Sequence, residues 1–145
     1  MKCRLSKLQE KTFKERFKEY PELKKLEKKL IKAGGGFMVP QPEPDLPLLL
    51  KEGELFPKLP ITFKKMRACN CHSNVSRLYK EGKIDAIVTG WALSDDCLWR
   101  QHSWGIVSGP KGDRIVETTG KRKKYYGVIL EGNEIDDFVT TNVIR

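Results

Sequence analysis

The sequence has no long apolar run and few cysteines. No stretch approaches the roughly 20 consecutive apolar residues that a membrane span requires, and the amino-terminal MKCRLSKLQEK lacks the apolar centre of a secretion signal. The four cysteines, Cys3, Cys69, Cys71 and Cys97, are too few and too irregularly spaced to indicate a disulfide framework. We therefore expect a soluble, cytoplasmic protein with reduced thiols and no membrane partner.

The length and the charge distribution indicate one domain with a basic amino-terminal segment. The 145 residues, 39% of them hydrophobic, suffice for a single core. The net charge is +9, and residues 1–33 hold 12 Lys and Arg against 5 Asp and Glu. The rest of the chain is therefore almost neutral. Because the positive charge is concentrated in the amino-terminal segment, the net charge does not by itself indicate a nucleic-acid-binding protein.

Periodicity divides the chain into three segments within one compact domain. Residues 1–36 form a basic amphipathic segment, predicted as one kinked helix or two short helices because Pro21 interrupts the apolar pattern. Residues 37–60 contain six prolines and are predicted to form an extended, polyproline-like connector. Residues 61–145 form the main core.

The main core has the pattern of an α+β domain. Residues 71–82, CHSNVSRLYKEG, are predicted as a helix that ends at Gly82. The β-branched and aromatic stretches 84–93, 102–108, 113–119 and 125–131 are predicted as strands of an antiparallel meander. The carboxy-terminal stretch NEIDDFVTTNVI is compatible with a short helix or with an edge strand.

Cys71 is the candidate nucleophile. A helix amino terminus, a nearby cation such as Arg67 and a partner imidazole each lower the pKa of a thiol, and His102 is the candidate partner. Glu117 is the candidate acceptor that would orient the imidazole. In a hairpin that turns at 108–113, residues whose numbers add up to about 220 face each other, a condition that His102 and Glu117 nearly meet.

The blocks CHSNVSRLY, GWAL, QHSWGIV, RIVETT and YYGVIL resemble the cysteine, histidine and acid blocks of the transglutaminase-like branch of the papain-like superfamily. The resemblance covers about residues 69–130 and implies a helix packed on an antiparallel sheet. It also implies a nucleophile at Cys71, a base at His102 and an orienting acid at Glu117. The chain departs from the family pattern by Glu117 in place of aspartate, by Thr118 in place of proline and by the additional thiol of Cys69.

These features predict a cysteine-dependent hydrolase or acyltransferase that acts on an amide or peptide bond, in a small amide, a peptide or a protein, without a cofactor. The acyl acceptor, water or an amine, and the oligomeric state stay open. The oxyanion would bind the Cys71 backbone N–H and a side chain, either Asn70 or Trp91. Asn74, one helical turn after Cys71, would either line the cleft or bind the loop before the helix.

Other interpretations compete with this one. A cysteine at a helix start and a histidine on a strand are also common as buried structural residues. A zinc site is disfavoured, because the two-residue spacer of structural sites is absent and Cys71 and His72 point about 100° apart on a helix. A non-catalytic basic module for nucleic acid or an acidic protein is the alternative, helped by KKMR at 64–67 and KRKK at 121–124 but without a recognised nucleic-acid motif. A structural adaptor using residues 1–60 is a further alternative.

Overall fold

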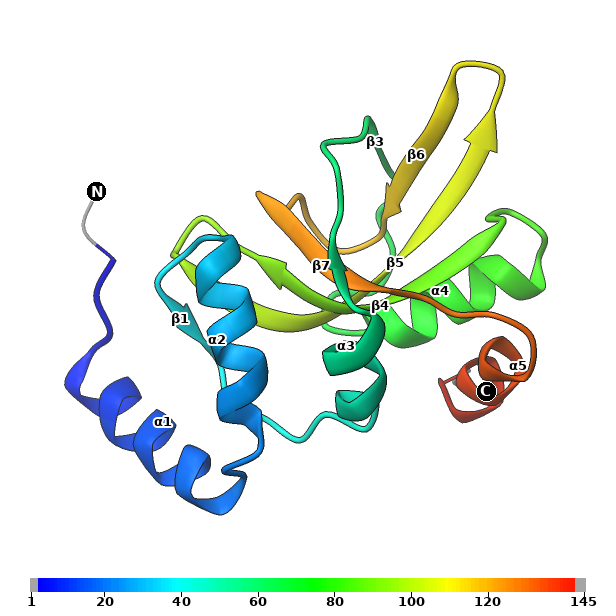
Figure 1. Cartoon of the computed structure of the whole chain (residues 1–145). Helices are drawn as coiled ribbons and strands as arrows, with labels where there is room; N and C mark the ends of the chain where they lie inside the picture. The colour runs from blue at the N-terminus through cyan, green and yellow to red at the C-terminus, as the bar shows by residue number, and fades with distance from the viewer. Residues whose placement is uncertain (1–2, 143–145) are drawn as a thin grey trace.

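The computed structural model describes residues 3–142 and shows an α+β fold with a seven-stranded, mostly antiparallel sheet, which confirms the predicted class. The elements in chain order are α1 (Lys7–Glu19), α2 (Leu23–Ala33), β1 (Phe37–Met38), α3 (Leu46–Glu52), β2 (Glu54–Leu55), β3 (Ile61–Phe63), α4 (Cys71–Lys80), β4 (Ala86–Leu93), β5 (Leu98–Gly109), β6 (Gly112–Glu117), β7 (Lys124–Ile129) and α5 (Asn133–Asn142). Figure 1 shows the sheet with helices α1 and α2 at one end and α5 at the other.

The sheet is not the predicted meander. Its order is β2-β7-β4-β5-β6-β3, with β1 pairing in parallel with β5. Strands β4, β5 and β6 follow one another as predicted, but β7 pairs with the far edge of β4, where Trp91 lies opposite Tyr126. Because β4 is buried along almost its whole length, it lies in the middle of the sheet with a partner on each side. Patterns within single strands do not reveal this crossing of the chain.

One edge of β5 is left open between two short pairings. The β5–β6 ladder ends at Gly105, which lies opposite Val116. On the same edge, β1 pairs only with Leu98 and Trp99. Within residues 3–142, no strand pairs with this edge at 100–104, and this gap positions the candidate site.

The amino-terminal segment forms two helices separated at Pro21, as its pattern allowed. A capping box begins α1: the Ser6 hydroxyl accepts from Gln9 N at 3.1 Å, and the Gln9 side chain accepts from Ser6 N at 2.9 Å. Helix α2 buries Leu26 and Leu30 completely. These leucines belong to the same hydrophobic cluster as the sheet residues, so α2 is part of the main core.

The proline-rich segment is not extended throughout, which corrects the sequence prediction. Helix α3 forms from 46 to 52 with Pro47 in its first turn, where the missing N–H has no intrahelical partner to lose. Leu46 and Leu49 of α3 are buried against the core. The open alternative at the carboxy terminus resolves to helix α5 over 133–142, and the predicted helix at 71 is α4.

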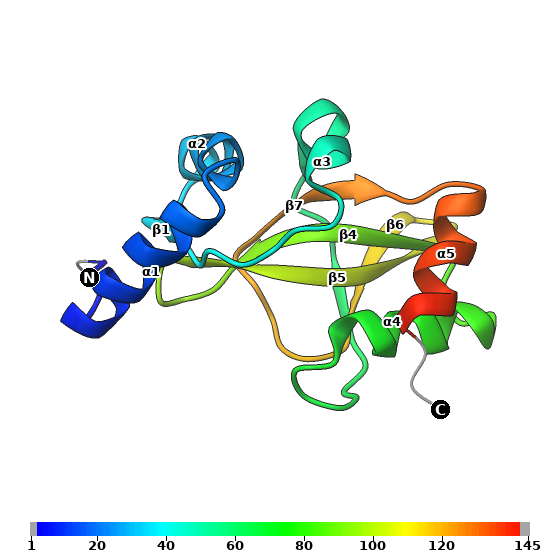
Figure 2. The same cartoon turned by 90° about the horizontal axis from the view of Figure 1, so that it is seen from below.

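The two faces of the sheet are covered differently. Helices α2, α3, α4 and α5 lie on one face, over buried side chains such as Trp91 and Tyr126 (Figure 2). The other face carries Trp104 and Tyr125 and is covered by the chain around Phe56. Helix α4 and the histidine strand β5 therefore meet at the sheet edge rather than across its middle.

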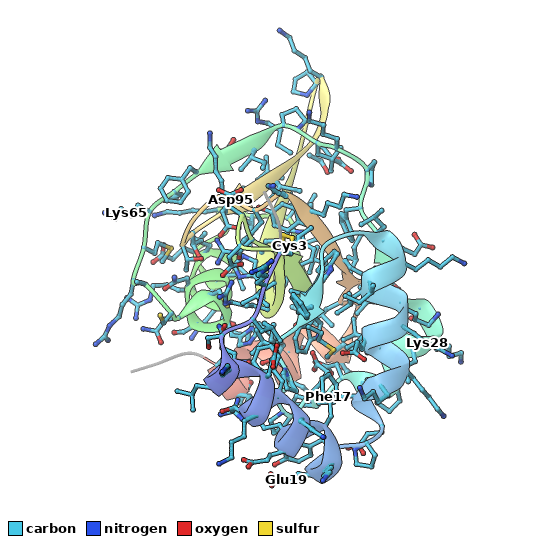
Figure 3. The ribbon with its side chains drawn as sticks, turned by 90° about the vertical axis from the view of Figure 1, so that its left-hand side faces the viewer. Cys3, Phe17, Glu19, Lys28, Lys65 and Asp95 are labelled. Carbon is cyan, nitrogen blue, oxygen red and sulfur yellow. A yellow bond between two sulfur atoms is a disulfide. The ribbon has the colours of Figure 1, made fainter. Side chains whose placement is uncertain are left out.

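A disulfide joins Cys3 to Cys97, so the expectation that all four thiols are reduced is wrong for this pair. The two cysteines are 94 residues apart in sequence, and their Cα atoms lie 5.8 Å apart. A separation of this length carries no sequence signal of pairing. Figure 3 labels Cys3 on the face of the molecule that is turned toward the viewer. In the part of the chain that the structure describes, no helix has the length and apolar character needed to cross a membrane.

Candidate active site

Cys71, His102 and Glu117 come together at the open edge of β5. Cys71 is the first residue of α4, His102 lies on β5 and Glu117 is the last residue of β6. His102 Nε2 lies 2.8 Å from Glu117 Oε1, and these side chains are 2% and 0% exposed. The strand ladder has ended before this pair, so their side chains bridge the gap where backbone pairing stops.

The Glu117 carboxylate is saturated with donors. Oε1 accepts from His102 Nε2 and from the Tyr125 hydroxyl at 2.9 Å. Oε2 accepts from the backbone N–H groups of Thr118 and Thr119 at 2.9 and 3.1 Å, and from the Thr119 hydroxyl at 3.3 Å. Burial alone would raise the pKa of Glu117, but the His102 interaction and these hydrogen bonds outweigh it and lower the pKa. Glu117 is therefore held as a buried anion.

The imidazole of His102 lies beside two aromatic rings that also contact each other. It stacks on Trp104 with ring centroids 6.0 Å apart and lies 6.3 Å from the Tyr125 ring. Because Nε2 donates to Glu117, the other ring nitrogen, Nδ1, is left for the Cys71 thiol. Burial acts to lower the pKa of His102, yet hydrogen bonds with Cys71 and Glu117 and the charge of Glu117 raise it overall. The imidazolium form is thus favoured.

The Cys71 thiol has the complementary shift. Burial acts to raise the pKa of Cys71, but the hydrogen bond and the charge of His102 lower it, helped by the backbone N–H groups of Ser103 and His72. The net effect is a lowered pKa, so the site favours a thiolate beside an imidazolium. Cys69 is exposed and lies before the helix in a left-handed conformation, with φ of 62°. The geometry therefore selects Cys71 from the two neighbouring thiols.

Not all of the predicted oxyanion and cleft residues lie at the candidate site around Cys71. Trp91 lies on the opposite face of the sheet from His102, and its Nε1 donates to Glu43 at 2.9 Å, which removes it as an oxyanion donor. Asn74 Nδ2 donates to the Arg67 carbonyl at 2.8 Å, so Asn74 binds the loop before the helix. Asn70 is the residue before the helix, and its side chain makes no capping hydrogen bond.

His72 belongs to a separate network on the other side of α4. Its Nδ1 is hydrogen-bonded to the Ser103 hydroxyl, which in turn donates to the Thr89 hydroxyl at 3.1 Å. Its ring packs edge-on against Phe138 of α5, with centroids 5.7 Å apart. Burial and the charge of His102 lower the pKa of His72, so its imidazole is neutral. Within residues 3–142, no three His, Cys, Asp or Glu side chains are grouped as metal ligands would be.

Two hollows of opposite charge flank the start of α4. A cavity of about 370 Å³ lies on the His72 side, and four carboxylates line it: Glu43, Asp45, Glu134 and Asp137. Burial is the main cause that raises the pKa of both Glu43 and Asp45. A groove of about 360 Å³ lies on the Asn70 side and includes the side chains of Arg67 and Arg77.

Three groups at the site were missed by sequence reasoning. These are the Tyr125 hydroxyl, the backbone N–H groups that follow Glu117, and the Ser103 N–H beside the sulfur. Tyr125 comes from β7, which reaches the site only through the unpredicted crossing of the chain. The backbone donors have no residue signature, although Thr118 in place of proline keeps an N–H that proline would lack.

Comparisons with models of known protein families, with curated proteins and with solved structures found no match to this chain. The site consists of a sulfur at a helix start, an imidazole and a buried carboxylate, in one hydrogen-bonded line at the edge of a sheet.

Proposed function

We propose that the protein is a cysteine-dependent hydrolase or acyltransferase that acts on an amide or peptide bond. The observation that carries the proposal is the hydrogen-bonded line from Cys71 through His102 to Glu117, with the pKa of the thiol lowered and that of the imidazole raised. A buried cysteine that served only for packing would gain nothing from a partner imidazole that is itself fixed by a buried carboxylate.

The chemistry follows from the protonation states. The Cys71 thiolate attacks the carbonyl carbon of the amide and forms a carbon–sulfur bond. The oxyanion lies toward the Cys71 N–H at the start of α4 and the Asn70 amide. The carbon–nitrogen bond then breaks as the His102 imidazolium gives its proton to the leaving amine. His102 next accepts a proton from water or a second amine, which attacks the thioester and releases Cys71.

The same geometry supports the finer fold proposal, a papain-like core of the transglutaminase-like kind. The nucleophile begins a helix, the histidine and the acid lie on neighbouring strands of an antiparallel sheet, and the chain order is cysteine, histidine, acid. The Glu117 side chain, longer than that of aspartate, spans the gap left by the end of the β5–β6 ladder. Hydrolysis is the simpler second step, because water needs no dedicated site.

Alkylation by iodoacetamide across pH tests this proposal without a known substrate. Cys71 is expected to be alkylated at a pH well below that required by a free cysteine, as read by mass spectrometry of the Cys71 peptide. In His102→Ala the rate at this pH should fall by about tenfold for each unit by which the pKa of the thiol rises, because only the thiolate is alkylated. Cys71→Ser, which keeps Cys69, should lose the low-pH labelling.

If Cys71 required the same alkaline pH as free cysteine, or if His102→Ala left the alkylation rate of Cys71 unchanged, the thiolate–imidazolium pair would not exist and the enzyme proposal would fail.

A second candidate, a basic binding module, is favoured by one observation. Every lysine of α1 and α2 is exposed, so these helices present positive charge to solvent. Binding of a polyanion to this face would weaken steeply with added salt and would be unaffected by Cys71→Ser. Loss of binding in Cys71→Ser would argue against this separate role.

A further inference from the structure

We infer that the groove beside Cys71 binds a carboxylate of the substrate, so that the site selects amides next to acidic residues. The inference rests on the proposed function, because it assigns a substrate class to that same nucleophile. The groove is lined by Met66, Arg67, Asn70, Ser73, Asn74 and Arg77.

The groove begins at the residue that precedes the nucleophile. Asn70 is the residue before Cys71, and Ser73, Asn74 and Arg77 follow along one side of α4. Its lining carries the positive charge of two exposed arginines, Arg67 and Arg77, beside the Asn70 side-chain amide, and it includes no carboxylate. Guanidinium and amide N–H groups are the donors that bind carboxylate oxygens best. The groove therefore has the chemistry of an anion subsite.

The backbone that carries Arg67 is held in place by the catalytic strand itself. Lys64 N donates to the Glu117 carbonyl at 2.8 Å, and Met66 N donates to the Thr118 carbonyl at 2.9 Å. Asn74 Nδ2 then holds the Arg67 carbonyl. Since the loop is bonded on both sides, the backbone bearing Arg67 is in position before a ligand arrives, which reduces the entropic cost of binding.

The charges around Cys71 are distributed unequally, with positive charge on the side of the groove. Exposed Lys64 and Lys65 extend the positive surface, and Figure 3 shows Lys65 at the outer side of the loop between β3 and α4. The nearby acid Glu81 is paired with Lys83 at 3.1 Å and also interacts with the charges of Arg77 and Lys64, so this one carboxylate faces three cations. The acid-lined cavity lies on the other side, beyond His72, and repels anions. A substrate carboxylate is thus attracted to one side of Cys71 only.

Two alkylating reagents of different charge measure this attraction at the sulfur. In both iodoacetate and iodoacetamide, the thiolate attacks the methylene carbon, the carbon–iodine bond breaks and iodide leaves. The reagents differ in the carboxylate, so the ratio of their rate constants at Cys71 reports the local field. In R67Q/R77Q the ratio of iodoacetate to iodoacetamide should fall by about three- to tenfold at low ionic strength, and less with added salt.

Lys28→Gln is the matched control, because it removes an exposed charge on α2 outside the groove. Its ratio should stay at the wild-type value. The single variants R67Q and R77Q, each with a partial decrease, serve if the double variant is unstable. If the ratio were unchanged in R67Q/R77Q while the iodoacetamide rate was preserved, the groove would not be a carboxylate subsite, and the proposal for the nucleophile would be unaffected. If iodoacetamide did not label wild-type Cys71 at low pH, the proposed function itself would be overturned.

Protection by peptides tests the substrate class directly. Capped hexaglutamate should slow the alkylation of wild-type Cys71 by iodoacetamide more than capped hexalysine does, and R67Q/R77Q should lose this difference. Equal protection by the two peptides would contradict a carboxylate subsite. Stronger protection by a single-stranded DNA of the same charge would overturn the acidic peptide in favour of nucleic acid.

Discussion

At the scale of single residues, the residues Glu117 and Thr118, two of the three departures from the family-like pattern, have a common physical role. Glu117 is long enough to reach His102 where the strands no longer pair, and Thr118 keeps a backbone N–H that bonds the same carboxylate at 2.9 Å. The Thr118 hydroxyl also accepts from Asn74 at 3.2 Å, which links the acid strand to α4. Both substitutions therefore support one buried anion.

The first prediction concerns the pH dependence of stability. Because folding lowers the pKa of Glu117, its ionised form adds stability at pH 7 that is lost as the pH falls from about 4.5 through the folded pKa. Glu117→Gln should therefore lower the free energy of unfolding by roughly 1–3 kcal/mol at neutral pH, and the difference from wild type should shrink in acid. Urea titrations at several pH values measure this.

Tyr125→Phe provides a milder variant at the same carboxylate. It removes one donor to Oε1 and should shift the stability in the same direction by a smaller amount. A constant difference between Glu117→Gln and the wild type from pH 7 to acid would show that Glu117 is not a buried anion.

At the scale of elements, the close pairing of β4 and β7 brings Tyr125 to the site. Gly90 of β4 lies between His102 on one side and Gly127 on the other. A Cβ at Gly90 would lie 2.5 Å from the Gly127 Cα and closer still to the Tyr126 carbonyl oxygen. Only glycine permits this approach of two backbones.

The second prediction follows from this approach. Gly90→Ala should separate β4 from β7 and lower the free energy of unfolding by roughly 1–3 kcal/mol or more. It should also reduce the low-pH alkylation of Cys71, because Tyr125 and the imidazole shift. Gly109→Ala is the control, since its Cβ would lie 3.8 Å from the nearest atom outside its immediate chain neighbours, an ordinary contact. Equal stability of the two variants would contradict the pairing.

At the scale of the whole molecule, the amino-terminal segment is fixed to the sheet by three kinds of contact. Leu26 and Leu30 of α2 are buried in the main core. Trp99 Nε1 donates to the Gly34 carbonyl at 2.9 Å. The Cys3–Cys97 disulfide closes the chain over 94 residues. The basic helices are therefore anchored to the domain that carries the site.

The third prediction concerns the disulfide. A bridge over this length restricts the unfolded chain strongly, so Cys3→Ser or reduction should lower the free energy of unfolding by about 2–5 kcal/mol. Low-pH labelling of Cys71 should persist, since the bridge contacts none of the three catalytic candidates. Cys69→Ser, at an exposed free thiol, should change stability by less than about 0.5 kcal/mol. A Cys3→Ser variant as stable as the wild type would exclude a stabilising bridge.

The local features of this protein could be predicted from its amino-acid sequence, because they depend on periodicity, capping and turn residues close together in the chain. The helix at Cys71, the two helices around Pro21 and the β5–β6 hairpin with His102 and Glu117 on one face were all predictable. Features that depend on contacts between residues distant in the sequence became visible only in the folded structure. The exclusion of Trp91 as an oxyanion donor, the placement of β7 beside β4 and the Cys3–Cys97 bridge belong to this class, since chain crossing and edge pairing are set by burial of whole elements and leave no short-range pattern.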